Sequence, residues 1–128
     1  MSQNGCAQTA EAVELVPKKE RKRVEREGAD RAKRAARRAM QSALDQGLEL
    51  AGLWLRDVAC VADGAEELVH NVDRLALLRE DAEGRRSAAL RDGQLLVEET
   101  RRRLEVNVTE ELALEQLAYR LAGALGRR

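Results

Sequence analysis

The chain has 128 residues, a length that suits one domain, or one domain with a tail. Hydrophobic residues make up 44% and charged residues 36% of it, and Ala and Leu dominate the apolar positions, with one Trp, one Tyr, one Pro and no Phe. This composition argues against a β-sandwich and favours helices that pack through aliphatic stripes. The formal net charge is zero, but the charges are unevenly distributed along the chain.

The cysteines and the apolar runs indicate the cellular compartment of the protein. Cys6 lies in a polar stretch and Cys60 in an apolar one, a pair that suggests neither a disulfide framework nor a zinc site. Both are most simply reduced thiols. No apolar run reaches membrane-spanning length, and the N-terminal residues lack the apolar core of a signal peptide. We therefore expect a soluble, cytoplasmic protein with no membrane partner.

Residues 1–17 and residues 18–40 differ in charge. The first segment is polar, alanine-rich and weakly patterned, and we expect it to be a linker or disordered. The second, a basic helical arm, has strong helix formers but almost no apolar stripe, and Gly28 is a point where its helix could divide. Its eleven basic residues, against four acidic ones, are Lys18, Lys19, Arg21, Lys22, Arg23, Arg26, Arg31, Lys33, Arg34, Arg37 and Arg38.

Two interpretations of the arm are open. A helix that is polar all round can be a solvated linker. It can also neutralise the phosphates of DNA or RNA, and the candidate phosphate contacts are then Lys33, Arg34, Arg37 and Arg38. The arm has no aromatic residue to stack on bases, so such binding would be weak and non-specific.

Residues 40–62 predict the first strongly apolar helix. Its seam consists of Leu44, Leu48, Ala51, Leu55, Val58 and Ala62, broadened by Trp54 and Val61. An apolar arc this wide predicts contact with more than one neighbouring helix. We expect this helix to continue from the arm through Gly47, because one glycine costs only about 1 kcal/mol, and to end at Asp63 and Gly64.

Residues 65–105 combine charged connections with two further helices. Asp73 is expected to cap a short leucine-rich helix, and Ser87 to cap a longer one. His70, the single histidine, lies in a short connection and has no catalytic partner in view. The positions that suggest a seven-residue spacing in the longer helix are Leu90, Val97, Thr100 and Leu104, with Leu96 alongside.

The most regular pattern lies in residues 101–125. Its apolar positions, at mostly three- and four-residue intervals, are Leu104, Val108, Leu112, Leu114, Leu117, Leu121 and Leu125, which indicates one face of a helix. A single break around Asn107 and Thr109 predicts a tight corner, since Asn107 tolerates the left-handed conformation and either residue can cap the next helix. The whole pattern predicts an all-α fold, a small antiparallel bundle of four to five helices over residues 41–128.

The sequence contains no recognisable catalytic arrangement. There is no glycine-rich loop followed by Lys and Ser or Thr, no His/Cys cluster with metal spacing, and no serine beside a base that could activate it. We therefore expect no enzymatic activity in this chain, no cofactor, no metal and no small-molecule substrate. Composition and pattern indicate a helical interaction module.

Four pieces of sequence, in order, extend this interpretation. They are Leu53–Val58 (LWLRDV), Val69–Asp73 (VHNVD), Thr100–Val108 (TRRRLEVNV) and Leu112–Glu115 (LALE), and a basic run precedes them. Together they resemble the C-terminal domain of bacterial DNA polymerase III delta-prime subunits of the actinobacterial type, over about residues 30–125. Thr109 departs from the family pattern, in which a polar residue and a proline more usually follow the Asn-Val pair.

The resemblance implies the collar domain of a clamp loader, without the two AAA+ domains that precede it in full-length subunits. Collar domains pack in a ring of five that holds the AAA+ modules loading the sliding clamp on primed DNA. The implied partners are the gamma/tau and delta subunits, in the cytoplasmic, nucleoid-associated replisome. The positions that the resemblance marks as interface or structural are Trp54, Arg56, Asp57, Leu104, Asn107, Leu114 and Glu115. The alternative is a basic-armed helical module that binds nucleic acid or another protein.

The marked polar positions also have simpler structural interpretations. Trp54 can fill the core, Asn107 can set the geometry of the corner, and Glu115 can be a solvated charge. Arg56 is likewise read as a solvated charge and Asp57 as a residue of the helix surface. Because these two residues are sequence neighbours, we expect their side chains to diverge and not to pair.

Overall fold

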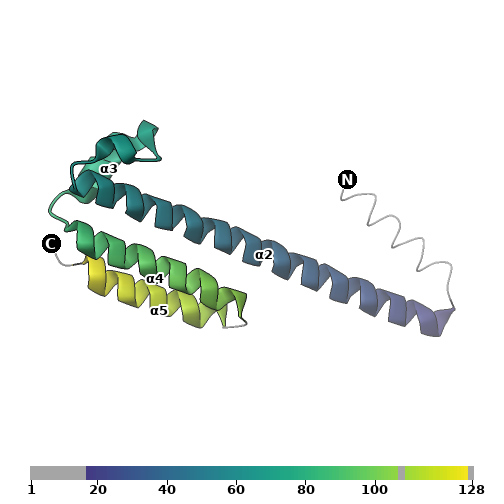
Figure 1. Cartoon of the computed structure of the whole chain (residues 1–128). Helices are drawn as coiled ribbons and strands as arrows, with labels where there is room; N and C mark the ends of the chain where they lie inside the picture. The colour runs from purple at the N-terminus through teal and green to yellow at the C-terminus, as the bar shows by residue number, and fades with distance from the viewer. Residues whose placement is uncertain (1–16, 107–108, 127–128) are drawn as a thin grey trace. The chain divides into compact units, whose positions relative to one another are not determined.

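Residues 17–106 and 109–126, the part of the chain that this computed structural model describes, contain helices and no strand (Figure 1). The four α-helices are α2 (Lys18–Ala62), α3 (Leu75–Ala82), α4 (Ser87–Glu105) and α5 (Glu110–Leu125). Two single-turn 3₁₀ helices, η1 (Glu66–Leu68) and η2 (Val72–Arg74), lie between α2 and α3. The predicted all-α bundle of four to five helices is confirmed for these residues.

Helix α2 is continuous over its 45 residues. The expected passage through Gly47 is therefore confirmed, whereas the suggested division at Gly28 is wrong. The contacts nevertheless separate the chain into two units, residues 1–43 and residues 44–128. In the described part of the first unit every residue is exposed except Val24 and Gly28, which are partly exposed. The core of the protein therefore belongs to the second unit.

Within the second unit, the α2 segment that begins at Leu44 runs antiparallel to α4, and α4 and α5 form an antiparallel hairpin (Figure 1). This hairpin is the one predicted from residues 101–125. Helix α2 packs closely on α4 at Gly52, where an added Cβ would lie 3.7 Å from Cγ1 of Val97. That is an ordinary van der Waals distance, so this position has room for a side chain as small as that of alanine.

A second glycine, Gly93 of α4, lies where three helices meet. An added Cβ there would be 3.3 Å from Cδ2 of Leu121, 3.4 Å from Cδ2 of Leu125 and 3.5 Å from Cδ1 of Leu55. These leucines come from α5 and α2, so the absent side chain of Gly93 leaves the space that they fill. Nothing in the sequence marked this position, because glycine contributes no side chain to an apolar pattern.

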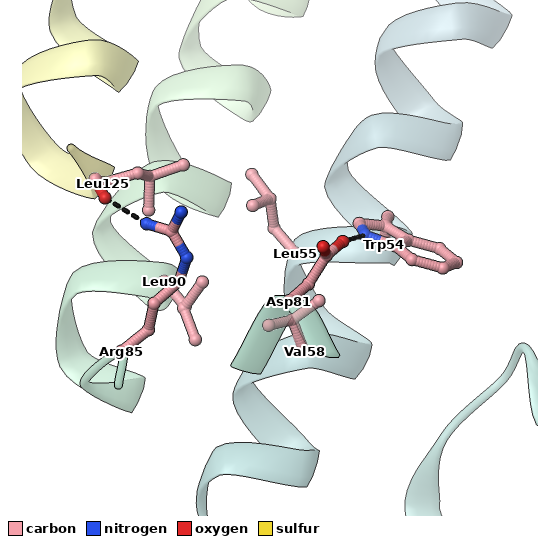
Figure 2. A pocket seen from close by; sticks show the side chains of 7 residues that line it. All are labelled: Trp54, Leu55, Val58, Asp81, Arg85, Leu90 and Leu125. Carbon is pink, nitrogen blue, oxygen red and sulfur yellow. Dashed lines mark hydrogen bonds between the residues drawn. The ribbon is translucent and has the colours of Figure 1, made fainter. Parts of the chain in front are cut away.

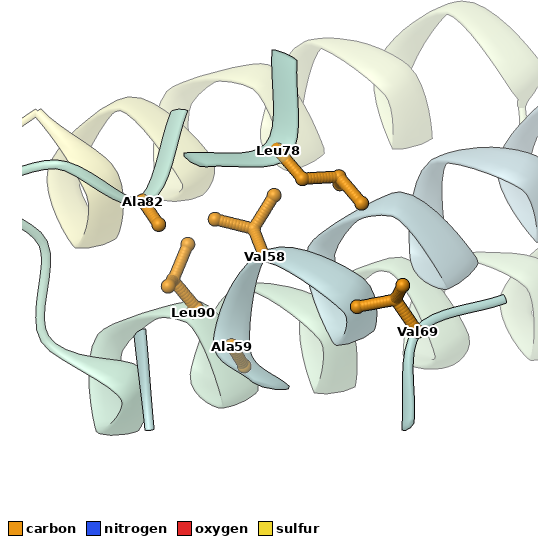
Figure 3. Packing of buried hydrophobic residues seen from close by; sticks show 6 residues of the cluster. All are labelled: Val58, Ala59, Val69, Leu78, Ala82 and Leu90. Carbon is orange, nitrogen blue, oxygen red and sulfur yellow. The ribbon is translucent and has the colours of Figure 1, made fainter. Parts of the chain in front are cut away.

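Two clusters of buried residues form the core. The first joins the C-terminal end of α2 to α3 and α4 and consists of Val58, Ala59, Val69, Leu78, Ala82 and Leu90 (Figure 3). The second joins α2, α4 and α5 and consists of Leu48, Val97 and Leu117. Leu55 packs against both clusters and thereby connects them.

The predicted apolar faces are only partly the buried ones. Leu48 and Val58 are buried as the seam of α2 predicted, but Ala51 and Ala62 are exposed. Leu112 was placed on the inner face of the hairpin and is 51% exposed. The buried residues of α5 are Ala113 and Leu117, and a helical residue next to Ala113 is rotated by roughly 100°, which turns Leu112 away from the core.

The helix ends also refine the predictions. Helix α2 stops before Asp63 and Gly64 as predicted, with Gly64 in the left-handed region at a φ of 78°. Asp73 does not cap α3 but lies inside η2. Ser87 is the first residue of α4 and its side chain makes no capping hydrogen bond, because the N-cap position is Arg86. The corner residue Asn107 lies outside the described residues.

Candidate functional site

Asp57, expected on the helix surface, is 0% exposed and is the main polar anchor of the second unit. Its Oδ1 accepts a hydrogen bond from the backbone N–H of His70 at 2.9 Å. Its Oδ2 accepts two from Asn71, one from the backbone N–H and one from Nδ2, both at 2.8 Å. Asp57 therefore holds the connection between η1 and η2 against α2, and the expectation of a surface position was wrong.

Arg56 also contradicts the prediction that it would not pair with Asp57. Its Nη1 lies 3.2 Å from Oδ1 of Asp57 and donates a second hydrogen bond to the carbonyl of Leu68 at 3.3 Å. The Cβ atoms of neighbouring helical residues point in different directions, but the guanidinium of Arg56 sits on a long flexible stem that folds back to Asp57. Arg56 and Asp57 together hold the chain after η1.

The environment of Asp57 keeps its carboxylate ionised. Burial by itself raises the pKa of this group because it disfavours the charged form. The hydrogen bonds from the amides of His70 and Asn71, together with the charge of Arg56, outweigh burial and hold the pKa of Asp57 below its ordinary value. The site is a fully satisfied buried anion with a structural role, and His70 contributes to it through its backbone only.

Trp54 ties α2 to α3 on the same side of the unit. Its Nε1 donates a hydrogen bond to Oδ2 of Asp81 at 2.7 Å, and its ring packs against the first core cluster. The Trp54 ring, Asp81 and Arg85 line a surface pocket of about 180 Å³, together with Leu55, Val58, Leu90 and Leu125 (Figure 2). Ligand pockets are typically about 300–1,000 Å³, so this one suits no drug-sized molecule.

The polar groups of this pocket already have partners. Arg85 donates a hydrogen bond to the carbonyl of Leu125 at the end of α5, and Asp81 accepts the one from Trp54. Because one contact joins α2 to α3 and the other joins the connection before α4 to the end of α5, the pocket residues stabilise the bundle.

The remaining sequence-derived positions lie in separate places. Leu104 of α4 and Leu114 of α5 pack against the second core cluster, whereas Glu115 is exposed. Asn107 cannot be placed, because it lies outside the described residues. The four candidate phosphate contacts, Lys33, Arg34, Arg37 and Arg38, are all exposed on α2 in the first unit.

A second charged group, centred on Arg101, was not identified from the sequence. Arg101 of α4 donates two hydrogen bonds to the carboxylate of Asp45 on α2, at 3.0 and 3.2 Å, and lies within 4 Å of Glu49 and Glu98. The hydrogen bond from Arg101 lowers the pKa of Asp45. The four-residue spacing of Asp45 and Glu49 was the available signal, but it does not say which basic residue approaches them.

The connection after α2 carries a further charged pair. Arg79 of α3 makes three hydrogen bonds of 2.6–3.1 Å to the carboxylate of Glu66 in η1, and this contact lowers the pKa of Glu66. Arg91 of α4 donates a hydrogen bond to Asp63 at the end of α2. These polar contacts thus join elements of the second unit to one another.

In residues 17–106 and 109–126, no group of three His, Cys, Asp or Glu side chains is placed to hold a metal ion. No helix in these same ranges is long and apolar enough to cross a membrane. No protein-family model matches the sequence, and no curated protein or solved structure matches the chain.

Proposed function

We propose that this chain is an oligomerisation module of the clamp-loader collar type, equivalent to the C-terminal domain of a bacterial DNA polymerase III delta-prime subunit. In this role it performs no reaction and helps hold the pentameric AAA+ assembly that loads the sliding clamp on primed DNA. Its partners are the collar domains of the gamma/tau and delta subunits, and its place is the replisome in the cytoplasm.

The contact between Asp57 and Asn71 is the observation that supports this proposal best. These two residues belong to two separate pieces of the resemblance, Leu53–Val58 and Val69–Asp73. They meet through a buried carboxylate, which takes two of its four hydrogen bonds from Asn71 and the other two from Arg56 and His70. The Arg-Asp piece and the Asn piece of the resemblance are therefore joined in space by hydrogen bonds to one buried group, whose polar atoms need such partners.

The solvent-facing side of α5 provides the apolar surface that an oligomerisation module needs. Leu112 is 51% exposed and Tyr119 is 84% exposed. The two are seven residues apart and so lie on one line of the helix, roughly opposite Ala113 and Leu117 in the core. We call Leu112 and Tyr119 the α5 ridge. Helix α5 therefore has apolar residues on two faces, one for its own core and one for a neighbouring subunit.

A mixing experiment tests the proposal. The chain is combined with the collar domains of gamma/tau and delta subunits, and assembly is followed by multi-angle light scattering. A defined hetero-complex is the expected result. Persistent absence of any complex at tens of micromolar would contradict the collar assignment, because a specific interface of standard size should be detectable at that concentration.

Two single substitutions locate the contact surface. Leu112→Glu places a charge on the α5 ridge and should abolish or strongly weaken the complex. Leu77→Glu on α3 is the matched control, because Leu77 is 49% exposed and so closely similar to Leu112. Equal loss of assembly in both variants would contradict the assignment of the contact to the α5 ridge.

A further inference from the structure

The charge of α2 is concentrated in one part of the first unit. The basic row, defined here as Arg31, Lys33, Arg34, Arg37 and Arg38, contains five positive charges, and no acidic residue occurs between Asp30 and Asp45. All five side chains are exposed. Residues 18–30, by contrast, alternate basic residues with Glu20, Glu25, Glu27 and Asp30.

The positive charges of the basic row are not paired with carboxylates of the described residues. Arg23 lies 3.9 Å from Glu27 one turn along the helix, whereas no member of the basic row lies within salt-bridge distance of a carboxylate among the described residues. Like charges also face each other at i,i+4 spacing, in Lys33 with Arg37 and Arg34 with Arg38. Such pairs disfavour an isolated helix, so the row is better suited to an external anion than to its own helix.

The spacing of the row matches a nucleic-acid backbone. Arg31, Arg34 and Arg38 follow each other at three- and four-residue intervals and share one face of α2, with Lys33 and Arg37 on the adjoining line. At about 1.5 Å of rise per residue the row is about 10 Å long, and a duplex carries about six phosphates over that length, one per about 1.7 Å of axis with both strands counted. Four of its members are arginines, whose planar guanidinium binds phosphate oxygens in pairs.

The opposite face of the same stretch argues against a membrane surface as the ligand. It presents Ala32, Ala36 and Ala39, and no Trp, Phe or Leu occurs from Arg31 to Ala43. Helices that lie in a membrane interface bury large apolar side chains of these types. Base stacking is likewise unavailable, because it requires aromatic residues.

The geometry points to a phosphate-binding surface: we propose that the basic row on α2 (Figure 1) binds the phosphodiester backbone of nucleic acid, without sequence preference. This activity is separate from the assembly role proposed above, which uses residues of the second unit. The row would hold a strand through charge neutralisation and arginine hydrogen bonds, and would not read bases.

Fluorescence polarisation with the full chain and a labelled mixed-sequence DNA duplex of about 30 base pairs tests this directly. If five phosphates are neutralised, the slope of log K against log salt is about −4.5, so that each doubling of salt weakens binding about 20-fold. A labelled single strand and an RNA duplex serve as parallel probes, and equal affinity for two unrelated DNA sequences is expected.

Matched variants assign the binding to the row. The triple variant R34Q/R37Q/R38Q keeps good helix formers and removes three contacts, so the slope should fall to about −2 and the affinity at about 50 mM salt should fall by more than about 100-fold. The control K18Q/K19Q/K22Q removes the same number of charges where acidic residues alternate, and should weaken binding by less than about 10-fold. Circular dichroism checks that both variants keep their helix.

Three results would overturn the proposal. One is absence of binding at about 20 mM salt, where non-specific phosphate contacts are strongest. The second is an unchanged slope in R34Q/R37Q/R38Q. The third is association with vesicles of about 30% phosphatidylserine in preference to DNA, since this would identify an anionic membrane as the ligand. None of these results bears on the hetero-complex, so failure here leaves the collar proposal separately testable.

Discussion

The first unit and the second unit use the same charged residue types in opposite ways. In the first, the members of the basic row on α2 are exposed, and no carboxylate within residues 17–106 and 109–126 lies at salt-bridge distance from them. In the second, Arg56, Arg79 and Arg101 each have a carboxylate partner on another residue of the fold. The arginines of the second unit thus pair with carboxylates within the fold, whereas the side chains of the basic row remain available to an external partner.

The difference arises from burial. Asp57 is withdrawn from water and must be satisfied within the fold, and four hydrogen bonds do so. A residue such as Arg34 stays in water and carries no such requirement. Substitutions in the two units should therefore have very different effects on stability.

Asp57→Ala should be the most damaging single change. It leaves the backbone N–H groups of His70 and Asn71 and the Nδ2 group of Asn71 without their acceptor. Loss of a buried charged partner typically costs about 3–5 kcal/mol of the free energy of unfolding. Urea unfolding followed by circular dichroism measures it. Asp92→Asn on the exposed side of α4 is the control and should change the free energy of unfolding by less than about 0.5 kcal/mol.

Gly93→Val should have a smaller but clear effect. Its side chain would enter space that Leu55, Leu121 and Leu125 already fill, and overpacking typically costs about 1–3 kcal/mol. Gly47→Ala on α2 is the matched control, because no atom lies within 4 Å of the added Cβ there. That variant should be more stable by about 0.5–1 kcal/mol, from helix propensity alone. Destabilisation by both variants would argue against the packing at Gly93.

Stability should fall in acid, and Asp57 should contribute to the fall. Its pKa in the folded protein lies below the ordinary value of 3.8. Its ionised form therefore stabilises the fold above that value, and this contribution is lost as the pH falls through the lowered pKa. In Asp57→Asn the decrease of unfolding free energy from about pH 5 to pH 2 should be shallower than in the unchanged protein. Parallel curves for the two proteins would contradict this account.

The smallest effect on stability is expected in the first unit. R34Q/R37Q/R38Q should leave the free energy of unfolding of the second unit, measured with urea, unchanged within about 0.5 kcal/mol, because exposed substitutions rarely do more. The same variant is expected to lose nucleic-acid binding. A large drop in this free energy would show that the two units are not independent in their stability.

The helices could be predicted because their signals are local. Apolar spacing along residues 40–62 and 87–125 indicated α2, α4 and α5, and Asp63 with Gly64 marked the end of α2. Where a side chain lay near the edge of a stripe, the prediction failed, as for Ala51 and Leu112. Spacing defines a face, but the neighbouring helices decide how wide the buried part of that face is.

The polar contacts could be predicted much less well. Asp57 and Arg56 were marked by resemblance, yet both the burial of Asp57 and its pairing with Arg56 were contrary to expectation. Arg101 and Gly93 were not marked at all, because one carries an ordinary surface charge in the sequence and the other has no side chain. Their importance depends on residues more than 25 positions away.

The sequence alone determined that this protein is helical, where its apolar helices lie and where its positive charge is concentrated, because helix propensity, apolar period and charge are properties of neighbouring residues. Tertiary structure alone decided that Asp57 is a buried anchor, that Gly93 is the meeting point of three helices, and that Leu112 and Tyr119 face solvent. Those outcomes depend on which segments meet in space, and burial then sets whether a charge or a leucine is satisfied internally or available to a partner.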